Sequence, residues 1–361
     1  MPFAPKNGNS IFVTIVVLSL CPTSRLWAYQ SADLSGVPLF PADNYWHWDI
    51  SQFKVHPNSD NFVGSIGRGT SLHPDFGTAL EGEPWGIPYV LVDKNQPKIP
   101  INFTDYGDES DVGPYPIPLT ANVEGGPAST GDRHVLAVDK DAKLLYEMFV
   151  AVPKNNRWDA ACGAVFDLSA NKMRTEGWTS ADAAGLPILP GLVRYDEIAK
   201  GEINHAIRMT VDTSQNKYLW PARHAASRNS NPNSPPMGLR FRLKASTNIS
   251  KFPRGALIVA TAMKKYGLIV ADNGGNWFIS GAPDDRMPDD EINALKGLKG
   301  SDFEAILTVD GSGNPIQPTN AIRFKPTRMH ANTMTARWFN LLGRLEGIYS
   351  LPSHSVKNFS K

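Results

Sequence analysis

Asp132, His134 and Glu147 place two carboxylates and an imidazole in one short region of the chain. Two carboxyl groups that flank a glycosidic bond are the usual machinery of glycoside hydrolysis, one as general acid and the other as base or nucleophile. A histidine beside them can hold or pass a proton. These residue types therefore favour a glycoside hydrolase with paired carboxylates, provided that the chain folds them onto one surface.

The alternation of apolar and polar residues predicts a hairpin of residues 133–138 and 143–152, joined by a polar turn over residues 139–142. If Val138 faces Leu144, Glu147 and Arg133 share one face of the hairpin, because side chains alternate along a strand. Glu147 is then either a catalytic carboxylate or half of a cross-strand ion pair with Arg133.

Residues 176–211 hold further candidates for acid–base chemistry, namely Asp182, Glu197 and His205. A Thr179/Ser180 cap predicts a helical turn before Gly185, and residues 196–200 predict a short helix that ends at Gly201. Acids in a first helical turn also stabilise the helix dipole, and a histidine on an apolar face is often a hydrogen-bonded core residue. The structural and the catalytic interpretations both remain open for these side chains.

Tryptophans near turns and strand ends are candidates for sugar binding, because aromatic rings stack on the apolar faces of pyranoses. We assign Trp46, Trp48 and Trp178 to this role. Arg208 is a further candidate, since it would neutralise a uronate if the enzyme were a polysaccharide lyase. In that alternative His205 is the base.

The chain lacks the signatures of several other classes of protein. It has no serine-hydrolase elbow, no zinc-protease motif, no phosphate loop and no paired CxxC, so we expect no cofactor and no metal in the active site. The acidic loop of residues 105–111 matches no known metal-binding loop, and a calcium site there stays an open alternative to a solvated turn. Cys162 lies among small apolar residues and is predicted to be buried.

Composition predicts a mainly β fold, a β-sandwich or jelly roll with a few short helices in long loops. The 30 Gly and 29 Pro indicate many turns, and strand-like stretches recur along residues 29–310, which we expect to form a single domain. Residues 253–266 form the clearest predicted helix, with Gly267 as its stop. Residues 268–271 and 276–280 flank an Asn-Gly turn and are predicted to pair as a hairpin.

Residues 1–28 are predicted to be a signal peptide, from Lys6, an apolar run over residues 11–20 and the small residue Ala28. Cleavage there would leave 36 − 2 = 34 basic and 35 acidic residues, a net charge of −1. We therefore expect a secreted or periplasmic protein without a transmembrane segment, with polysaccharide or oligosaccharide rather than nucleic acid as its partner. The oligomeric state stays open.

Residues 311–361 are predicted to form a basic C-terminal extension, with seven Lys or Arg and one Glu. Trp338, Leu341, Leu342 and Leu345 fall at helical spacing, which predicts an amphipathic helix in this tail. That helix would pack on the body or bind a membrane surface or partner.

The phrases GDRHVLAVD, WTSADAAGLPILPGLVRYDEI, PPMGLRFRLKAS and YGLIVADNGGNWFISGAPDDR resemble a group of exported bacterial proteins with no established activity. The resemblance implies a single exported bacterial domain. The leading hypothesis is thus an exported glycoside hydrolase. The alternatives are a non-catalytic carbohydrate-binding or cell-envelope structural module and a polysaccharide lyase.

Overall fold

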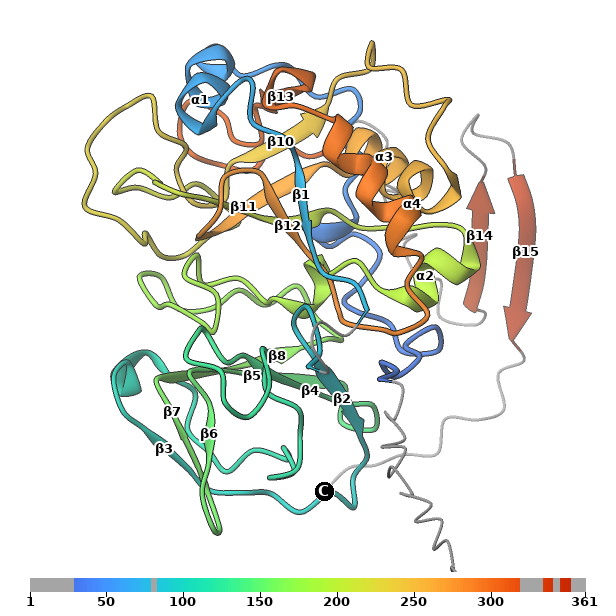
Figure 1. Ribbon diagram of the computed structural model, residues 1–361. Helices are drawn as coiled ribbons and strands as arrows, with labels where there is room; N and C mark the ends of the chain where they lie inside the picture. The colour runs from blue at the N-terminus through green and yellow to red at the C-terminus, as the bar shows by residue number, and fades with distance from the viewer. Residues whose placement is uncertain (1–28, 79–82, 319–333, 340–344, 352–361) are drawn as a thin grey trace, which may run out of the picture.

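The computed structural model describes residues 29–78, 83–318, 334–339 and 345–351. The predicted signal peptide and most of the basic tail lie outside these ranges. Within the described residues, strands outnumber helices and form three mixed sheets and one two-stranded antiparallel sheet, with a few short helices, so the prediction of a mainly β fold is confirmed. Figure 1 shows the largest sheet and its helices in an upper tier, with strands β2 to β8 below it.

The largest sheet has six strands and both parallel and antiparallel neighbours. In spatial order they are β1 (His73–Asp75), β12 (Phe278–Ser280), β9 (Ile207–Val211), β11 (Leu268–Asn273), β10 (Arg240–Leu243) and β13 (Phe303–Ile306). Strand β9 is parallel to β11 and antiparallel to β12. It therefore lies between two strands that follow each other in the sequence.

This insertion corrects the predicted Asn-Gly hairpin, which would have paired β11 directly with β12. The chain reverses after Asn273, but the hydrogen-bonded turn lies at residues 275–278, where the Phe278 N–H donates to Gly275 O at 3.3 Å, and the Gly274 N–H donates to Val211 O at the end of β9 at 2.9 Å. The residues of the turn predict that the chain reverses there. They carry no information on β9, which lies about 60 residues earlier in the sequence and inserts between the two strands. The consequence is that β9 side chains have neighbours from both β11 and β12.

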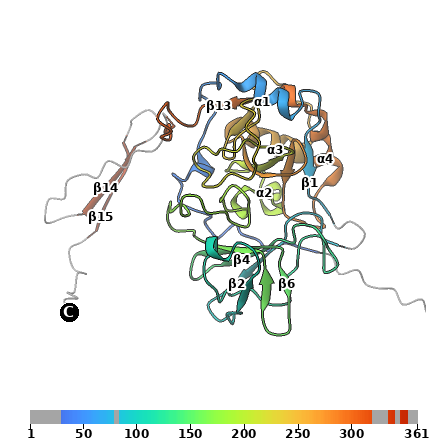
Figure 2. The same ribbon diagram turned by 90° about the vertical axis from the view of Figure 1, so that its left-hand side faces the viewer.

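Two smaller sheets form the lower tier, which Figure 2 shows from another side. The four-stranded sheet contains β2 (Tyr89–Val92), β4 (Val135–Asp139), β5 (Leu144–Phe149) and β8 (Cys162–Asp167), in that order. The three-stranded sheet contains β3 (Ile101–Phe103), β7 (Trp158–Ala160) and β6 (Val152–Pro153).

The four-stranded sheet is buried on both faces. Leu136, Val138 and Leu145 belong to the main hydrophobic core, which continues into the six-stranded sheet. Val135 and Tyr146 belong to a second core that reaches the three-stranded sheet. Burial on both sides fixes the register of these strands, because a one-residue slip would exchange the contents of the two cores.

The predicted register of the β4–β5 hairpin is wrong by one residue. Leu144 faces Asp139 and Glu147 faces Leu136, so Glu147 points into the main core. The loop between the paired residues is one residue shorter than predicted, with four residues between Asp139 and Leu144 where pairing of Val138 with Leu144 leaves five. Its last residue, Lys143, adopts a positive φ of 55°, a conformation that composition does not predict for a lysine.

Among the described residues, four α-helices and five single-turn 3₁₀ helices lie around the sheets. The α-helices are α1 (Ser59–Ile66), α2 (Tyr195–Lys200), α3 (Arg254–Lys265) and α4 (Asp289–Asn293). The 3₁₀ turns span Tyr45–His47, Gly107–Glu109, Leu189–Gly191, Ala294–Gly297 and Gly300–Asp302. The described residues carry no helix of the length and apolar character that a bilayer span requires.

Helix α3 confirms the clearest helix prediction and packs on β10 and α4. It ends before Gly267, whose φ of +74° suits glycine and where an added Cβ would lie 2.2 Å from Phe241 O. The chain therefore enters β11 directly after Gly267. By contrast, the helical turn predicted after Ser180 is absent and the chain makes a non-helical turn there.

The basic tail differs from the prediction where it is described. Strands β14 (Met334–Phe339) and β15 (Leu345–Leu351) pair antiparallel, so the amphipathic helix predicted across Trp338 and Leu345 is wrong. Leu341 and Leu342, the other two residues of that predicted helix, lie outside the described residues.

Candidate active site

A polar pocket of about 100 Å³ opens where the end of β9 meets the start of β4. Its lining comes from segments far apart in the sequence, namely Asp75, Ile87, Glu124, Asp132, His134, Arg208, Thr210, Asn273, Gly274, Gly275, Phe278 and Ser280. Side chains of both charges therefore surround a space that is large enough for a small polar group.

Arg208 forms the floor of this pocket and is 4 % exposed. Its Nε and Nη2 donate to the two carboxylate oxygens of Asp182, each at 2.8 Å. Nη1 donates to Ser280 Oγ at 2.7 Å, and Nη2 also reaches Asp272 Oδ2 at 3.2 Å. The position of β9 between β11 and β12 explains this set, since Asp272 and Ser280 lie on its two neighbours.

The turn after Ser180 delivers Asp182 to the guanidinium. The Asp182 N–H donates to Ser180 Oγ at 3.0 Å, and that hydroxyl lies 2.7 Å from Asp182 O. Asp182 itself is fully buried, so its charge has no solvent to stabilise it. A bidentate contact with Arg208 is the geometry that offsets such burial best.

His134 and Glu124 form a second ion pair at the wall of the pocket. His134 Nδ1 lies 2.6 Å from Glu124 Oε2, and Nε2 lies 3.0 Å from Ala181 O. A carbonyl only accepts, so Nε2 must carry a proton. Burial acts to lower the pKa of His134, but the Glu124 carboxylate raises it by more, to about 9. With both ring nitrogens engaged, His134 holds Glu124 in place.

Two further carboxyl groups near Arg208 differ in proton affinity. Glu124 lines the pocket, whereas Asp272 contacts Arg208 but is not among the lining residues. Burial acts to raise the pKa of Glu124, but His134 lowers it by more, to below its ordinary value. Burial and the nearby Asp182 charge raise the pKa of Asp272 to about 7, against the lowering effect of Arg208. At weakly acidic pH Glu124 is therefore ionised while Asp272 carries a proton.

Asp132 lies at the rim of the same pocket and is exposed. Asp75, from β1, also lines the pocket and accepts a hydrogen bond from Trp85 Nε1 at 3.2 Å. Of the candidates from the sequence, Asp132, His134, Asp182 and Arg208 thus come together at this one place.

Glu147 is completely buried on the main-core face of β5. Its carboxyl group accepts hydrogen bonds from the Ile188 N–H at 2.9 Å and the Leu189 N–H at 3.0 Å. Burial raises the pKa of Glu147 to about 7. The predicted ion pair with Arg133 is wrong, since Arg133 donates instead to the carbonyls of Ala151, Pro127 and Ser129. Glu147 links the two tiers and does not line the pocket.

Glu197 and His205 form a separate buried cluster at helix α2. His205 Nε2 lies 3.0 Å from Glu197 Oε1, and Arg194 Nη2 lies 2.8 Å from the same oxygen. Burial acts to raise the pKa of Glu197, but Arg194 and His205 together lower it by more. Because His205 Nδ1 also lies 2.7 Å from Ala206 O, both of its nitrogens are engaged. His205 precedes β9 and does not belong to it.

The three candidate tryptophans lie in different surroundings. Trp46 is fully buried and Trp48 nearly so, in an aromatic cluster with Tyr45 and Trp220. The structure thus places Trp46 and Trp48 in the core, away from solvent. Trp178 is half-buried and lines a different hollow.

Sequence reasoning missed Glu124, Asp272 and Ser280. Asp272 and Ser280 belong to the hairpin whose strand pairing was predicted wrongly. Their contacts with Arg208 could therefore not be predicted. Glu124 lies in a loop without periodic pattern, and only its contact with His134 reveals it. An acid at the end of an apolar strand, as in Leu268–Asn273, was the one local signal available for Asp272.

Across the described ranges no cluster of three or more His, Cys, Asp or Glu side chains is arranged to hold a metal ion. In the loop proposed as a calcium alternative, Glu109 Oε2 accepts from the Thr179 N–H at 2.7 Å and Asp111 pairs with Arg174. Cys162 is buried as predicted, with Sγ 3.0 Å from Ser180 O. Comparison with models of protein families, with curated proteins and with solved structures gave no match.

We expect Glu147→Gln to flatten the dependence of stability on pH. The folded protein holds the Glu147 proton up to about pH 7, whereas the unfolded chain loses it near pH 4.3. Stability from this group therefore falls as pH rises between these values, by up to about 1.4 kcal/mol per pH unit. Urea unfolding at several pH values should show a smaller decline for Glu147→Gln; an identical slope in both proteins would contradict the assignment.

Arg208→Met should destabilise the fold by about 3–5 kcal/mol, because it leaves the Asp182 charge buried without a partner. The double variant Arg208→Met with Asp182→Leu should recover much of that loss, since no unpaired charge remains at this position. Chemical denaturation of the single and double variants measures both. Additive losses in the double variant would show that the pair does not interact as described.

Proposed function

We propose that the protein is an exported glycoside hydrolase whose active site is the pocket above Arg208. The observation that supports it best is the pair Glu124 and Asp272. Both carboxyl groups lie in the electrostatic environment of one buried guanidinium, and their surroundings favour opposite protonation states. Two carboxyl groups with separated pKa values are the requirement for acid–base cleavage of a glycosidic bond.

In this mechanism Asp272 is the general acid and donates its proton to the leaving-group oxygen. Glu124, held ionised by His134, acts on the opposite side as base or nucleophile. Arg208 does not touch the substrate in this account. It is a positioning residue, because its hydrogen bonds to Asp182, Ser280 and Asp272 fix the acid relative to the sheet.

The finer expectations from the sequence belong to the same proposal. They are a sandwich or jelly-roll arrangement of the sheets, a signal peptide over residues 1–28, a secreted or periplasmic location and a polysaccharide or oligosaccharide partner. The predicted signal pattern supports export, and the charge-rich pocket supports a polar, uncharged substrate such as a sugar. Neither Glu147 nor Glu197 has a role in cleavage here, since Glu147 is completely buried and Glu197 lies in the enclosed cluster at α2.

A non-catalytic carbohydrate-binding or structural module is the alternative that the pocket also accommodates. The lyase alternative has less support, because both ring nitrogens of its proposed base, His205, are engaged by protein groups. A side chain whose nitrogens are both occupied cannot accept a proton from a sugar without first breaking a buried contact.

We expect Asp272→Asn to reduce hydrolysis of a neutral polysaccharide about 10²–10⁴-fold, because the amide cannot supply the proton. The rate for the unmodified protein should fall above about pH 7, where Asp272 ionises. Release of reducing ends from a panel of polysaccharides measures both. Glu202→Gln, which changes an exposed carboxylate paired with Lys200, is the matched control and should retain full activity. Folded protein that releases no reducing ends from any member would exclude the hydrolase and leave the binding module.

A further inference from the structure

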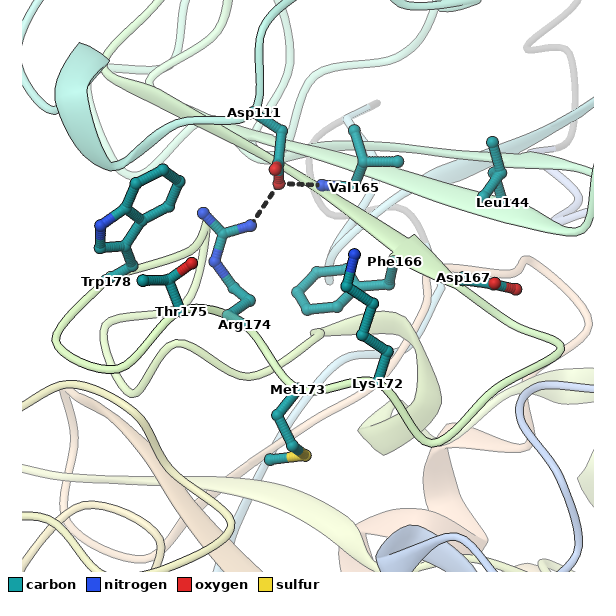
Figure 3. Close-up of a pocket in the computed structure, with 10 residues that line it drawn as sticks. All are labelled: Asp111, Leu144, Val165, Phe166, Asp167, Lys172, Met173, Arg174, Thr175 and Trp178. Atoms are coloured by element: carbon teal, nitrogen blue, oxygen red, sulfur yellow. Dashed lines mark hydrogen bonds and ion pairs between the residues drawn. The ribbon is translucent and has the colours of Figure 1, made fainter.

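A larger groove of about 300 Å³ lies beside the edge of the four-stranded sheet. Figure 3 shows its lining, which combines strands β5 and β8, the loop that follows β8, and Asp111, which follows the 3₁₀ turn Gly107–Glu109: Asp111, Leu144, Val165, Phe166, Asp167, Lys172, Met173, Arg174, Thr175 and Trp178. Its volume falls within the size range of ligand sites, so the groove is large enough to bind a small molecule.

The aromatic wall of the groove is held rigidly. The Arg174 guanidinium lies 5.7 Å from the Trp178 ring and 5.8 Å from the Phe166 ring. It also donates to Asp111 Oδ2 at 2.5 Å and to the carbonyls of Thr179 and Glu109. Figure 3 shows this guanidinium between the Trp178 ring and Asp111. The half-buried indole thus offers a pre-positioned apolar surface, which reduces the entropy lost on binding.

The charged groups of the groove balance. Lys172 and Arg174 are opposed by Asp111 and Asp167, so the lining has no net charge. The Arg174 charge is already paired with Asp111. In Figure 3 the Lys172 side chain reaches across the groove in front of the Phe166 ring. Lys172 supplies donors, and Asp167 and Thr175 supply acceptors, around an apolar floor. A ligand with hydroxyl groups and no charge matches this lining better than an anion or a cation.

One continuous segment connects the groove to the candidate active site. Lys172, Met173, Arg174, Thr175 and Trp178 line the groove, and the chain then reaches Ala181, whose carbonyl accepts from His134, and Asp182, which holds Arg208. The same segment of the chain therefore helps to shape both places.

We propose that this groove is a subsite for a neutral sugar unit, which stacks on Trp178 and hydrogen-bonds to Lys172. The inference rests on the proposed function and specifies its substrate class as an uncharged glycan. Removal of the ring should therefore weaken binding at least tenfold.

Titration calorimetry with Asp272→Asn protein tests the groove without turnover. The probes are neutral hexasaccharides of glucose, mannose and N-acetylglucosamine, with an oligogalacturonate as the charged comparison. At least one neutral chain should bind and the oligogalacturonate should bind more weakly. Adding Trp178→Ala should weaken binding at least tenfold, Trp178→Phe should retain most of it, and Lys172→Met should weaken it several-fold. Lys251→Met, an exposed lysine elsewhere, should change nothing.

Three results would overturn the proposal: no neutral chain binds, Trp178→Ala binds unchanged, or the oligogalacturonate binds best. Failure of the proposed function looks different. If the protein with Asp272 intact releases no reducing ends, but oligosaccharide binding depends on Trp178, the hydrolase proposal is wrong and the groove proposal stands. Hydrolysis by a Trp178→Ala protein at an unchanged KM rejects the groove and retains the hydrolase.

Discussion

The bidentate contact between Arg208 and Asp182 is the interaction on which the rest of the site depends. Neither charge is exposed, and removing either partner would leave a buried ion, which is far more destabilising than replacing both. The fold therefore has to bring the turn after Ser180 onto strand β9 and keep it there. That requirement also fixes Ala181 against His134, so the two ion pairs of the pocket are aligned by one short turn.

The mainly β character and helix α3 could be predicted from turn composition and helical periodicity, because both are local properties. The order of the six-stranded sheet could not. Parallel pairing of β9 with β11 depends on a core contact between distant segments, and the Asn-Gly turn gave a locally valid but wrong neighbour for β11. The register of β4 and β5 failed for a similar reason, since the two cores rather than the turn determine it.

The candidate site was predictable only in part. Residue types and their places in the chain selected His134 and Asp182 for acid–base chemistry and Arg208 to neutralise a uronate, whereas their ion pairs are seen only in the structure. The same reasoning also selected Glu197 and His205, because an ion cluster that anchors a helix has the composition of a catalytic one. The two sets of residues differ in their exposure to solvent. Solvent reaches Glu124 beside Arg208, whereas protein groups enclose the cluster at α2.

The proposed mechanism requires that Glu124 be ionised and Asp272 be protonated beside the one buried guanidinium of Arg208. Carbon-13 NMR titration of the side-chain carboxyl groups measures this directly, with Glu124→Gln and Asp272→Asn proteins used for assignment. We predict that Asp272 titrates near pH 7 and that the pKa of Glu124 lies below its ordinary value. Titration of both groups together near pH 4 would contradict it, because a pocket that does not separate them offers no distinct acid and base.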